Sequence, residues 1–223
     1  MPKSAKKQNY ILGVTIGRFS PFHKGNSLVF KRIAPYCNKI VVFVAGQKES
    51  VENPFSYELR KQIIDKSLGP IMYKTSVKPA ILKKGKKIIQ TGFIYSFLDK
   101  MDISESVDGI LVFVGTDRYQ EYRKQLKEAQ AHNAKLKKVR VVNGGIGLNE
   151  FGSKIDATAI RGALLSNDAP FIKNYLATPI SDNPNFFKEI YGKMRQEIDT
   201  TYDAQEFEKL AQKSEDDDSK KKQ

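Results

Sequence analysis

The chain has 223 residues, 40% of them hydrophobic, and a formal net charge of +13. This is enough apolar material for one sizeable core, or for one domain with a short appendage. No apolar run approaches the roughly 18 residues that a membrane-spanning helix requires, and the polar segment 1–9 lacks the apolar region of a signal peptide. The single cysteine, Cys37, cannot form an internal disulfide, so we expect a cytoplasmic protein that does not bind a membrane.

Hydrophobic patterning predicts strands that alternate with helices along most of the chain. In chain order, we expect a buried strand at 10–17, a helix at 27–36, a strand at 39–46, a helix at 55–68, a strand at 71–77, a lysine-rich loop, a short helix at 91–98, a strand at 108–115, a helix at 117–131 and a strand at 138–143. From Ala157 to about Leu210 the pattern is helical and is interrupted by Pro170, Pro179 and Pro184.

Strands that alternate with helices are typical of βαβ units and a mainly parallel sheet. We therefore predict an α/β fold with a parallel sheet of about five strands, helices on both faces and additional C-terminal helices. We divide the chain into a flexible basic N-terminus (1–9), a main domain (10–178), a helical appendage (179–212) and a disordered charged tail (213–223). In such sheets ligands bind beyond the carboxyl ends of the strands, so the residues that follow Gly17, Gly46 and Gly115 are candidates for a site.

The segment GRFSPFHKGN, residues 17–26, has the features of a phosphate-binding corner. It joins a buried strand to a helix, whose N-terminal N–H groups and dipole favour anions. Gly17 and Gly25 allow a ligand to approach the backbone closely. Side-chain donors are added by Arg18, His23 and Lys24. This concentration of donors and positive charge predicts a polyphosphate site.

A second phosphate contact is predicted at DATAIRGAL, residues 156–164. The Thr158 hydroxyl and the backbone N–H groups at the start of this helix would face phosphate, and Arg161 lies one turn later on the same side. Arginine suits phosphate because its guanidinium makes paired, charge-assisted hydrogen bonds. The alternative is an ordinary helix start with Asp156 as the N-cap.

Two more loops follow predicted strands and carry polar residues. AGQKESVENPF, residues 45–55, leads into a helix that contains Arg60, and VGTDRY, residues 114–119, leads into a charged helix. Each loop has a structural alternative, because Asn53 and Asp117 could each cap the helix that follows.

These motifs occur in the order found in one superfamily. GRFSPFHKGN resembles the GxFxPxHxGH signature of the HIGH-type nucleotidyltransferases, and its form GRFxPFHKG is most similar to archaeal-type nicotinamide mononucleotide adenylyltransferases and their bacterial and phage relatives. DATAIRGAL resembles the (S/T)xxxIR signature that closes the triphosphate site. The NPF loop and the GxDR segment resemble further parts of the same family, and the resemblance covers roughly residues 10–178.

The resemblance implies a Rossmann-like fold and an attack by an acceptor phosphate on the α-phosphorus of ATP, with pyrophosphate leaving. The catalytic residues that it implies are Arg18, His23, Lys24 and Arg161. The implied ATP or phosphate contacts are Gly17, Arg18, Phe19, His23, Gly25, Asn26, Thr158, Ile160 and Arg161. The implied acceptor contacts are Asn53, Phe55, Arg60, Gly115 and Asp117. The NPF loop favours nicotinamide mononucleotide as the acceptor, to give NAD, and the alternative is a cytidylyltransferase that acts on a phosphorylated alcohol.

Asn26 departs from the signature, which ends in histidine. Asparagine can donate a neutral hydrogen bond but cannot become cationic. Loss of a cationic contact to developing phosphate charge would cost on the order of 10²–10³ in rate. One hypothesis keeps catalysis, with Lys24, Arg18, Arg161 and Mg²⁺ supplying the charge. The other is a protein that binds a nucleotide without turning it over.

Mg²⁺ is the expected cofactor, bound mainly through the triphosphate, because the sequence shows no cluster of metal ligands. The expected partners are a nucleoside triphosphate and a small phosphorylated acceptor. A homo-oligomer is compatible with the resemblance, and no residue pattern sets its stoichiometry. The lysine clusters at 83–87 and 135–140 are more often solvated surface than binding sites, so nucleic acid is not an expected partner.

Overall fold

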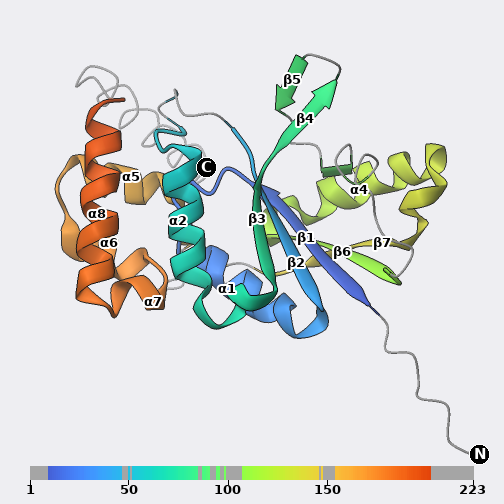
Figure 1. Ribbon diagram of the computed structural model, residues 1–223, viewed down its shortest axis with the longest axis horizontal. Coiled ribbons are helices and arrows are strands. Elements are labelled where there is room, and N and C mark those ends of the chain that lie inside the picture. Colours follow the sequence, from blue (N-terminus) through green and yellow to red (C-terminus); the bar gives the residue numbers. More distant parts are fainter. Residues whose placement is uncertain are drawn as a thin grey trace, which may run out of the picture.

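A parallel sheet of five strands forms the centre of the molecule (Figure 1). The computed structural model describes residues 10–46, 50, 52–84, 87–90, 94, 95, 98, 107–145, 147 and 154–201. The strands of this sheet are β1 (Ile11–Gly17), β2 (Lys39–Val44), β3 (Thr75–Pro79), β6 (Gly109–Val114) and β7 (Val139–Asn143). Their order is β3-β2-β1-β6-β7, and every neighbouring pair runs parallel.

Helices cover both faces of the sheet (Figure 1). The helices of the described residues are α1 (Lys24–Ile33), α2 (Tyr57–Leu68), α4 (Thr116–His132), α5 (Ala157–Leu165), α6 (Ala169–Tyr175), α7 (Thr178–Ser181) and α8 (Pro184–Asp199), with 3₁₀ helices at Ala34–Tyr36, Gly69–Lys74 and Ala134–Lys138. Alternate residues of β2 point to opposite faces, so Ile40 and Val42 pack with α1, α2 and the C-terminal helices, whereas Val41 and Phe43 pack with α4. The predicted α/β fold is confirmed. Within the described part of the chain, no helix is long and apolar enough to cross a membrane.

Two predicted segments differ from the structure. The strand expected at 71–77 begins only at Thr75, because Gly69, with φ of 42°, and Pro70 start a 3₁₀ helix that continues to Lys74. The lysine-rich segment expected as a loop forms an antiparallel hairpin of β4 (Ile81–Lys84) and β5 (Lys87–Gln90) that projects from the sheet (Figure 1).

Other expected segments lie wholly or partly outside the described residues. Of the helix predicted at 91–98, only Ile94, Tyr95 and Leu98 are described, and all three are helical. The basic N-terminus (1–9) and the charged tail (213–223) fall outside the described residues.

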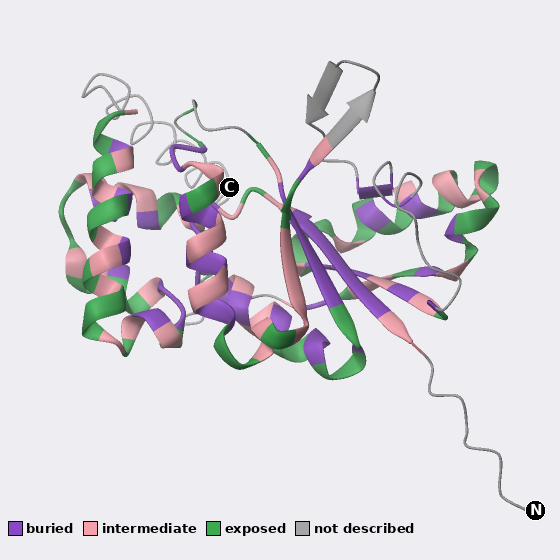
Figure 2. Cartoon of the chain, in the orientation of Figure 1, coloured by how far each residue is buried: buried purple, intermediate pink, exposed green. Residues whose placement is uncertain are grey.

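The C-terminal helices share a core with the sheet (Figure 2). Ile190, Met194 and Ile198 of α8 are fully buried in the hydrophobic cluster that also contains the buried residues of α2. Glu197 of α8 accepts hydrogen bonds from the backbone N–H (2.5 Å) and the hydroxyl (2.7 Å) of Ser56, the N-cap of α2. Helix α8 therefore holds the start of α2 in place. A domain boundary at residue 178 remains a proposal based on the sequence.

Candidate active site

A cavity of about 550 Å³ opens at the carboxyl ends of β1 and β6. The chain runs from β1 outward to β2 and β3 and then returns to β6, on the other side of β1. The strand order therefore reverses between β1 and β6, which is where open parallel sheets bind ligands, because the adjoining loops diverge. Gly17, the last residue of β1, lines the cavity, and so does Gly115, which follows β6.

The cavity brings together residues of all four predicted segments, including Ala45 and Glu52 of segment 45–55. The predicted residues that line it are Gly17, Arg18, Phe19, His23, Gly25, Asn26, Gly115, Asp117, Thr158 and Arg161. The predicted residues outside the lining are Lys24, Asn53, Phe55, Arg60 and Ile160. Phe55 and Ile160 are fully buried in the core, and Lys24 is exposed, with its ammonium 3.5 Å from the carbonyl oxygen of Asn174. The direct contacts that we expected from these three side chains are therefore not present in the site as it stands.

His23 and Asn26 form the start of helix α1. His23 is the N-cap, and its backbone N–H donates to Oδ1 of Asn26 at 3.1 Å. The imidazole faces the backbone N–H of Asn26 in return, which completes a capping box, although Nδ1 makes no hydrogen bond of normal geometry within the described residues. Because Oδ1 of Asn26 is occupied in this way, its amide nitrogen is the group left to donate to a ligand.

Burial keeps the His23 imidazole neutral. It lowers the pKa of His23 from 6.5 to about 4, while the carboxylate of Asp156 raises this pKa and the ammonium of Lys154 lowers it further. The neutral ring offers one N–H donor and one acceptor nitrogen. His23 is thus arranged as a neutral hydrogen-bond donor beside the helix N-terminus.

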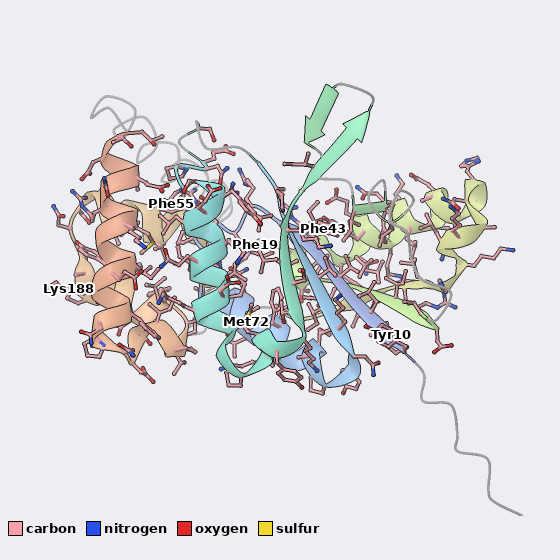
Figure 3. All side chains as sticks on the ribbon, in the orientation of Figure 1. Tyr10, Phe19, Phe43, Phe55, Met72 and Lys188 are labelled. Atoms are coloured by element: carbon pink, nitrogen blue, oxygen red, sulfur yellow. The ribbon has the colours of Figure 1, made fainter. Side chains whose placement is uncertain are left out.

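Phe19 and Arg18 shape the edge of the cavity next to β1. Phe19 has φ of 50°, an uncommon value for a residue with a side chain, and its ring lies over Gly17, where a Cβ atom would be 2.9 Å from Cζ of the ring. Figure 3 shows Phe19 between α2 and the sheet, and Phe55 beside α2. Arg18 pairs with Glu52 at the solvent-exposed rim, where such a pair is weak and can be exchanged for a ligand.

Asp156 is the N-cap of helix α5. Its Oδ1 accepts hydrogen bonds from the N–H groups of Thr158 (2.6 Å) and Ala159 (3.1 Å). Our prediction that these backbone groups face phosphate is therefore wrong for both, because the carboxylate already satisfies them. Arg161 remains at the cavity, where its guanidinium donates to the carbonyl of Ser20 (2.7 Å) and to the hydroxyl of Thr158 (3.1 Å).

Arg60 supports the loops and does not reach the cavity. Its side chain is 1% exposed, and the guanidinium donates to the carbonyl oxygens of Arg18 (2.9 Å), Ala45 (2.6 Å) and Gly46 (2.6 Å). Burial lowers the pKa of Arg60 to about 10, so the side chain stays charged. The expected acceptor contact of Arg60 is thus corrected to a role in joining the segments that follow β1 and β2.

The glycine-rich loop after β7, which our sequence analysis missed, completes the cavity. Gly145 and Gly147 line it, and a Cβ atom on Gly147 would lie only 2.2 Å from Cα of Gly25. The backbone of this loop therefore rests directly on the start of α1. Three glycines within five residues after a predicted strand, in NGGIG (143–147), were the signal available in the sequence.

Replacement of Gly147 by alanine is expected to destabilise the fold by about 1–3 kcal/mol, because the new methyl group would overlap backbone that cannot move without displacing α1. The matched control is Gly192→Ala in α8, where a Cβ atom meets nothing within 4 Å and alanine favours a helix by about 0.5–1 kcal/mol. Urea unfolding would measure both. A Gly147→Ala variant as stable as the parent chain would contradict the close contact.

Metal ligands do not gather in the described part of the chain. No group of three or more His, Cys, Asp or Glu side chains comes together there. The carboxylates of the cavity lining are already engaged: Glu52 with Arg18, Asp117 with Lys154, and Asp156 with the start of α5.

A parallel sheet with phosphate-type donors at its switch point defines the class of Rossmann-like nucleotide-binding proteins. The profile of the cytidylyltransferase-like family matches residues 14–163, and the chain belongs to this family of nucleotidyltransferases. The predicted superfamily is confirmed.

Individual relatives agree with this assignment. The nicotinamide-nucleotide adenylyltransferase of Halobacterium salinarum is 29% identical over 102 residues, which are 45% of this chain and 57% of that protein. The match to this curated relative therefore spans little more than half of its length.

Two solved structures share the fold. The bifunctional NMN adenylyltransferase/ADP ribose pyrophosphatase from Francisella tularensis superposes with a TM-score of 0.55 at 19% identity, over 84% of this chain and 53% of that one. The Plasmodium falciparum nicotinic acid mononucleotide adenylyltransferase superposes with a TM-score of 0.54 at 15% identity, over 82% of this chain and 96% of that one.

Proposed function

We propose that this protein transfers AMP from ATP to nicotinamide mononucleotide and so produces NAD and pyrophosphate. The observation that carries the proposal is the cavity at the switch point, which gathers segments 17–26, 115–117 and 158–161 from distant parts of the sequence. The name of the Halobacterium relative supports the choice of acceptor.

The triphosphate is proposed to lie against the start of α1. The first backbone N–H groups of a helix lack partners within it and, with the helix dipole, attract anions. The imidazole N–H group of His23 and the amide nitrogen of Asn26 add neutral donors at the same corner. Arg161, whose guanidinium donates to the carbonyl of Ser20 in segment 17–26, adds a fixed positive charge to the cavity lining.

Transfer of the nucleotidyl group then needs little covalent chemistry from the protein. An oxygen of the acceptor phosphate attacks the α-phosphorus of ATP, the bond from that phosphorus to the bridging oxygen breaks, and pyrophosphate leaves with the electron pair. The protein contributes positioning and stabilisation of charge. We propose that Mg²⁺ enters on the triphosphate and neutralises part of its charge, which fits a cavity whose carboxylates are already engaged.

The acceptor is proposed to bind near the end of β6, where Gly115 and Asp117 line the cavity. Gly115 leaves room there, since a Cβ atom would lie 2.7 Å from Oδ1 of Asp117. Asn53 is buried beside Gly46, 2.9 Å from where a Cβ of that glycine would be, so it supports the neighbouring loop. A cytoplasmic location and a homo-oligomeric state remain proposals that rest on the sequence and its resemblance.

A panel of substrate pairs tests the proposal. The purified full chain is incubated with MgATP or MgCTP and, in turn, nicotinamide mononucleotide, nicotinic acid mononucleotide, phosphocholine, glycerol phosphate or phosphopantetheine. We expect release of pyrophosphate and formation of NAD with ATP and nicotinamide mononucleotide. Activity only with CTP and a phosphorylated alcohol would overturn the substrate assignment. Binding of ATP without pyrophosphate release from any pair would show a nucleotide-binding protein that does not turn it over.

A further inference from the structure

Lys154 lines the cavity but belongs to none of the motifs that define it. It lies two residues before the cap of α5, and its ammonium is 2.8 Å from Oδ2 of Asp117, in the first turn of α4. The pair thus crosses the cavity from the segment before α5 to the end of β6.

The backbone next to Lys154 is attached to the corner that holds His23 and Asn26. Ile155 is buried, and its N–H donates to the carbonyl of Gly147 at 3.0 Å. A Cβ atom on Gly25 would lie 3.4 Å from Cβ of Ile155. The ammonium also contributes to lowering the pKa of His23, after burial, which is the larger cause. Lys154 is therefore placed to act on the same phosphates as the start of α1.

Each cation of the motifs already has a protein partner. The ammonium of Lys24 contacts the carbonyl of Asn174, outside the cavity lining. Arg18 pairs with Glu52 at the rim next to β2, and Arg161 donates to Ser20. Asn26 itself carries no charge. Position 26 consequently lacks the cation that a histidine there could provide.

We propose that Lys154 binds the triphosphate of ATP and supplies there the positive charge that Asn26 cannot. This rests on the proposed function. The side chains of Lys154 and Asp117 are 51% and 49% exposed, and an ion pair of this kind is worth at most about 1 kcal/mol. A triphosphate carries several negative charges, so its oxygens can replace the carboxylate of Asp117 as the partner of the Lys154 ammonium with little loss of free energy. Lysine suits the exchange because its flexible stem carries a mobile point charge with three donors.

The test compares Lys154→Gln with Lys127→Gln, a matched loss of charge on an exposed residue of α4 outside this cavity lining. Two quantities are measured: the Kd of MgATP and of tripolyphosphate by titration calorimetry, and kcat/KM for pyrophosphate release. We expect Lys154→Gln to weaken binding and to lower kcat/KM by about 10- to 100-fold, as for lost charge-assisted contacts. Lys127→Gln should stay within about twofold, because exposed charges contribute little, and Lys154→Arg should keep most of the binding.

A double variant tests the link to Asn26. Asn26→His introduced into Lys154→Gln should restore at least part of the lost binding, so that the two changes are not additive. Lys154→Gln that binds tripolyphosphate and ATP as the parent chain does would overturn the proposal, and a loss that Asn26→His leaves unchanged would overturn the compensation. The binding arm also separates the two proposals. If the parent chain releases no pyrophosphate, the proposed function is wrong. The role of Lys154 is then still tested by comparing the Kd of MgATP and of tripolyphosphate between the parent chain and Lys154→Gln.

Discussion

His23→Ala is expected to lower the rate of pyrophosphate release by about 10²–10³-fold, since it removes a preorganised donor where charge develops in the transition state. The imidazole is held in one orientation by burial and by the capping box with Asn26. The other histidine of the chain, His132, is exposed at the end of α4, so His132→Ala is the matched control and should leave the rate unchanged. Equal rates for both variants would remove His23 from the mechanism.

The same residue predicts a dependence of stability on pH. The folded pKa of His23, about 4, lies below the ordinary value of 6.5, so the unfolded chain takes up the proton first as the pH falls. The contribution of neutral His23 is therefore complete above pH 6.5 and is lost as the pH falls toward 4, at up to about 1.4 kcal/mol per pH unit. The free energy of unfolding of the parent chain should fall more steeply over this range than that of His23→Asn. Parallel curves for the two chains would contradict the assigned pKa.

Arg60→Met is expected to destabilise the fold by about 1–3 kcal/mol, because it leaves partly buried carbonyl groups without their charged donor. The guanidinium joins the carbonyls of Arg18, Ala45 and Gly46, so its loss would also release the segments after β1 and β2. A displacement of about 1 Å at these segments would cost about 10²-fold in rate, since transfer depends on positioning. Urea unfolding and the kcat and KM for pyrophosphate release would measure the two effects.

Lys61→Met is the matched control for Arg60→Met. It makes the same change of charge on the same helix, but among the described residues Lys61 forms an ion pair only with Asp65, one turn away, a contact worth about 0.5 kcal/mol. Arg60→Lys should recover little, because an ammonium cannot reproduce the planar set of donors. A kcat and KM that remain normal in folded Arg60→Met would show that the arginine supports stability alone.

The motif GRFSPFHKGN could be interpreted from the sequence because its information is local. A strand, two glycines and a helix start lie next to one another in the chain, and their joint effect follows from backbone chemistry. The misplaced third strand has a local cause as well, since Gly69 and Pro70 set a 3₁₀ helix that hydrophobicity alone does not reveal. The loop NGGIG could have been included on the same grounds as the first motif, because its glycines also follow a strand.

The roles of Arg60 and Lys154 could not be predicted in this way. In sequence, Arg60 resembles a ligand-binding arginine, and only its 1% exposure and its carbonyl partners show a supporting role. Lys154 is one of many lysines in a chain of net charge +13. Its place opposite Asp117 depends on how the segment before α5 meets α4.

The sequence by itself therefore determined the alternation of strands and helices and the superfamily, and it predicted segment 17–26 as the phosphate corner, because each of these depends on neighbouring residues. Tertiary structure decided which charges reach the cavity. Lys24 and Arg60 donate hydrogen bonds to backbone carbonyls. Asp156 caps the start of α5, and Lys154 lies in the cavity lining. A side chain's burial and its partners depend on residues that are distant in the chain, and packing alone brings those residues together.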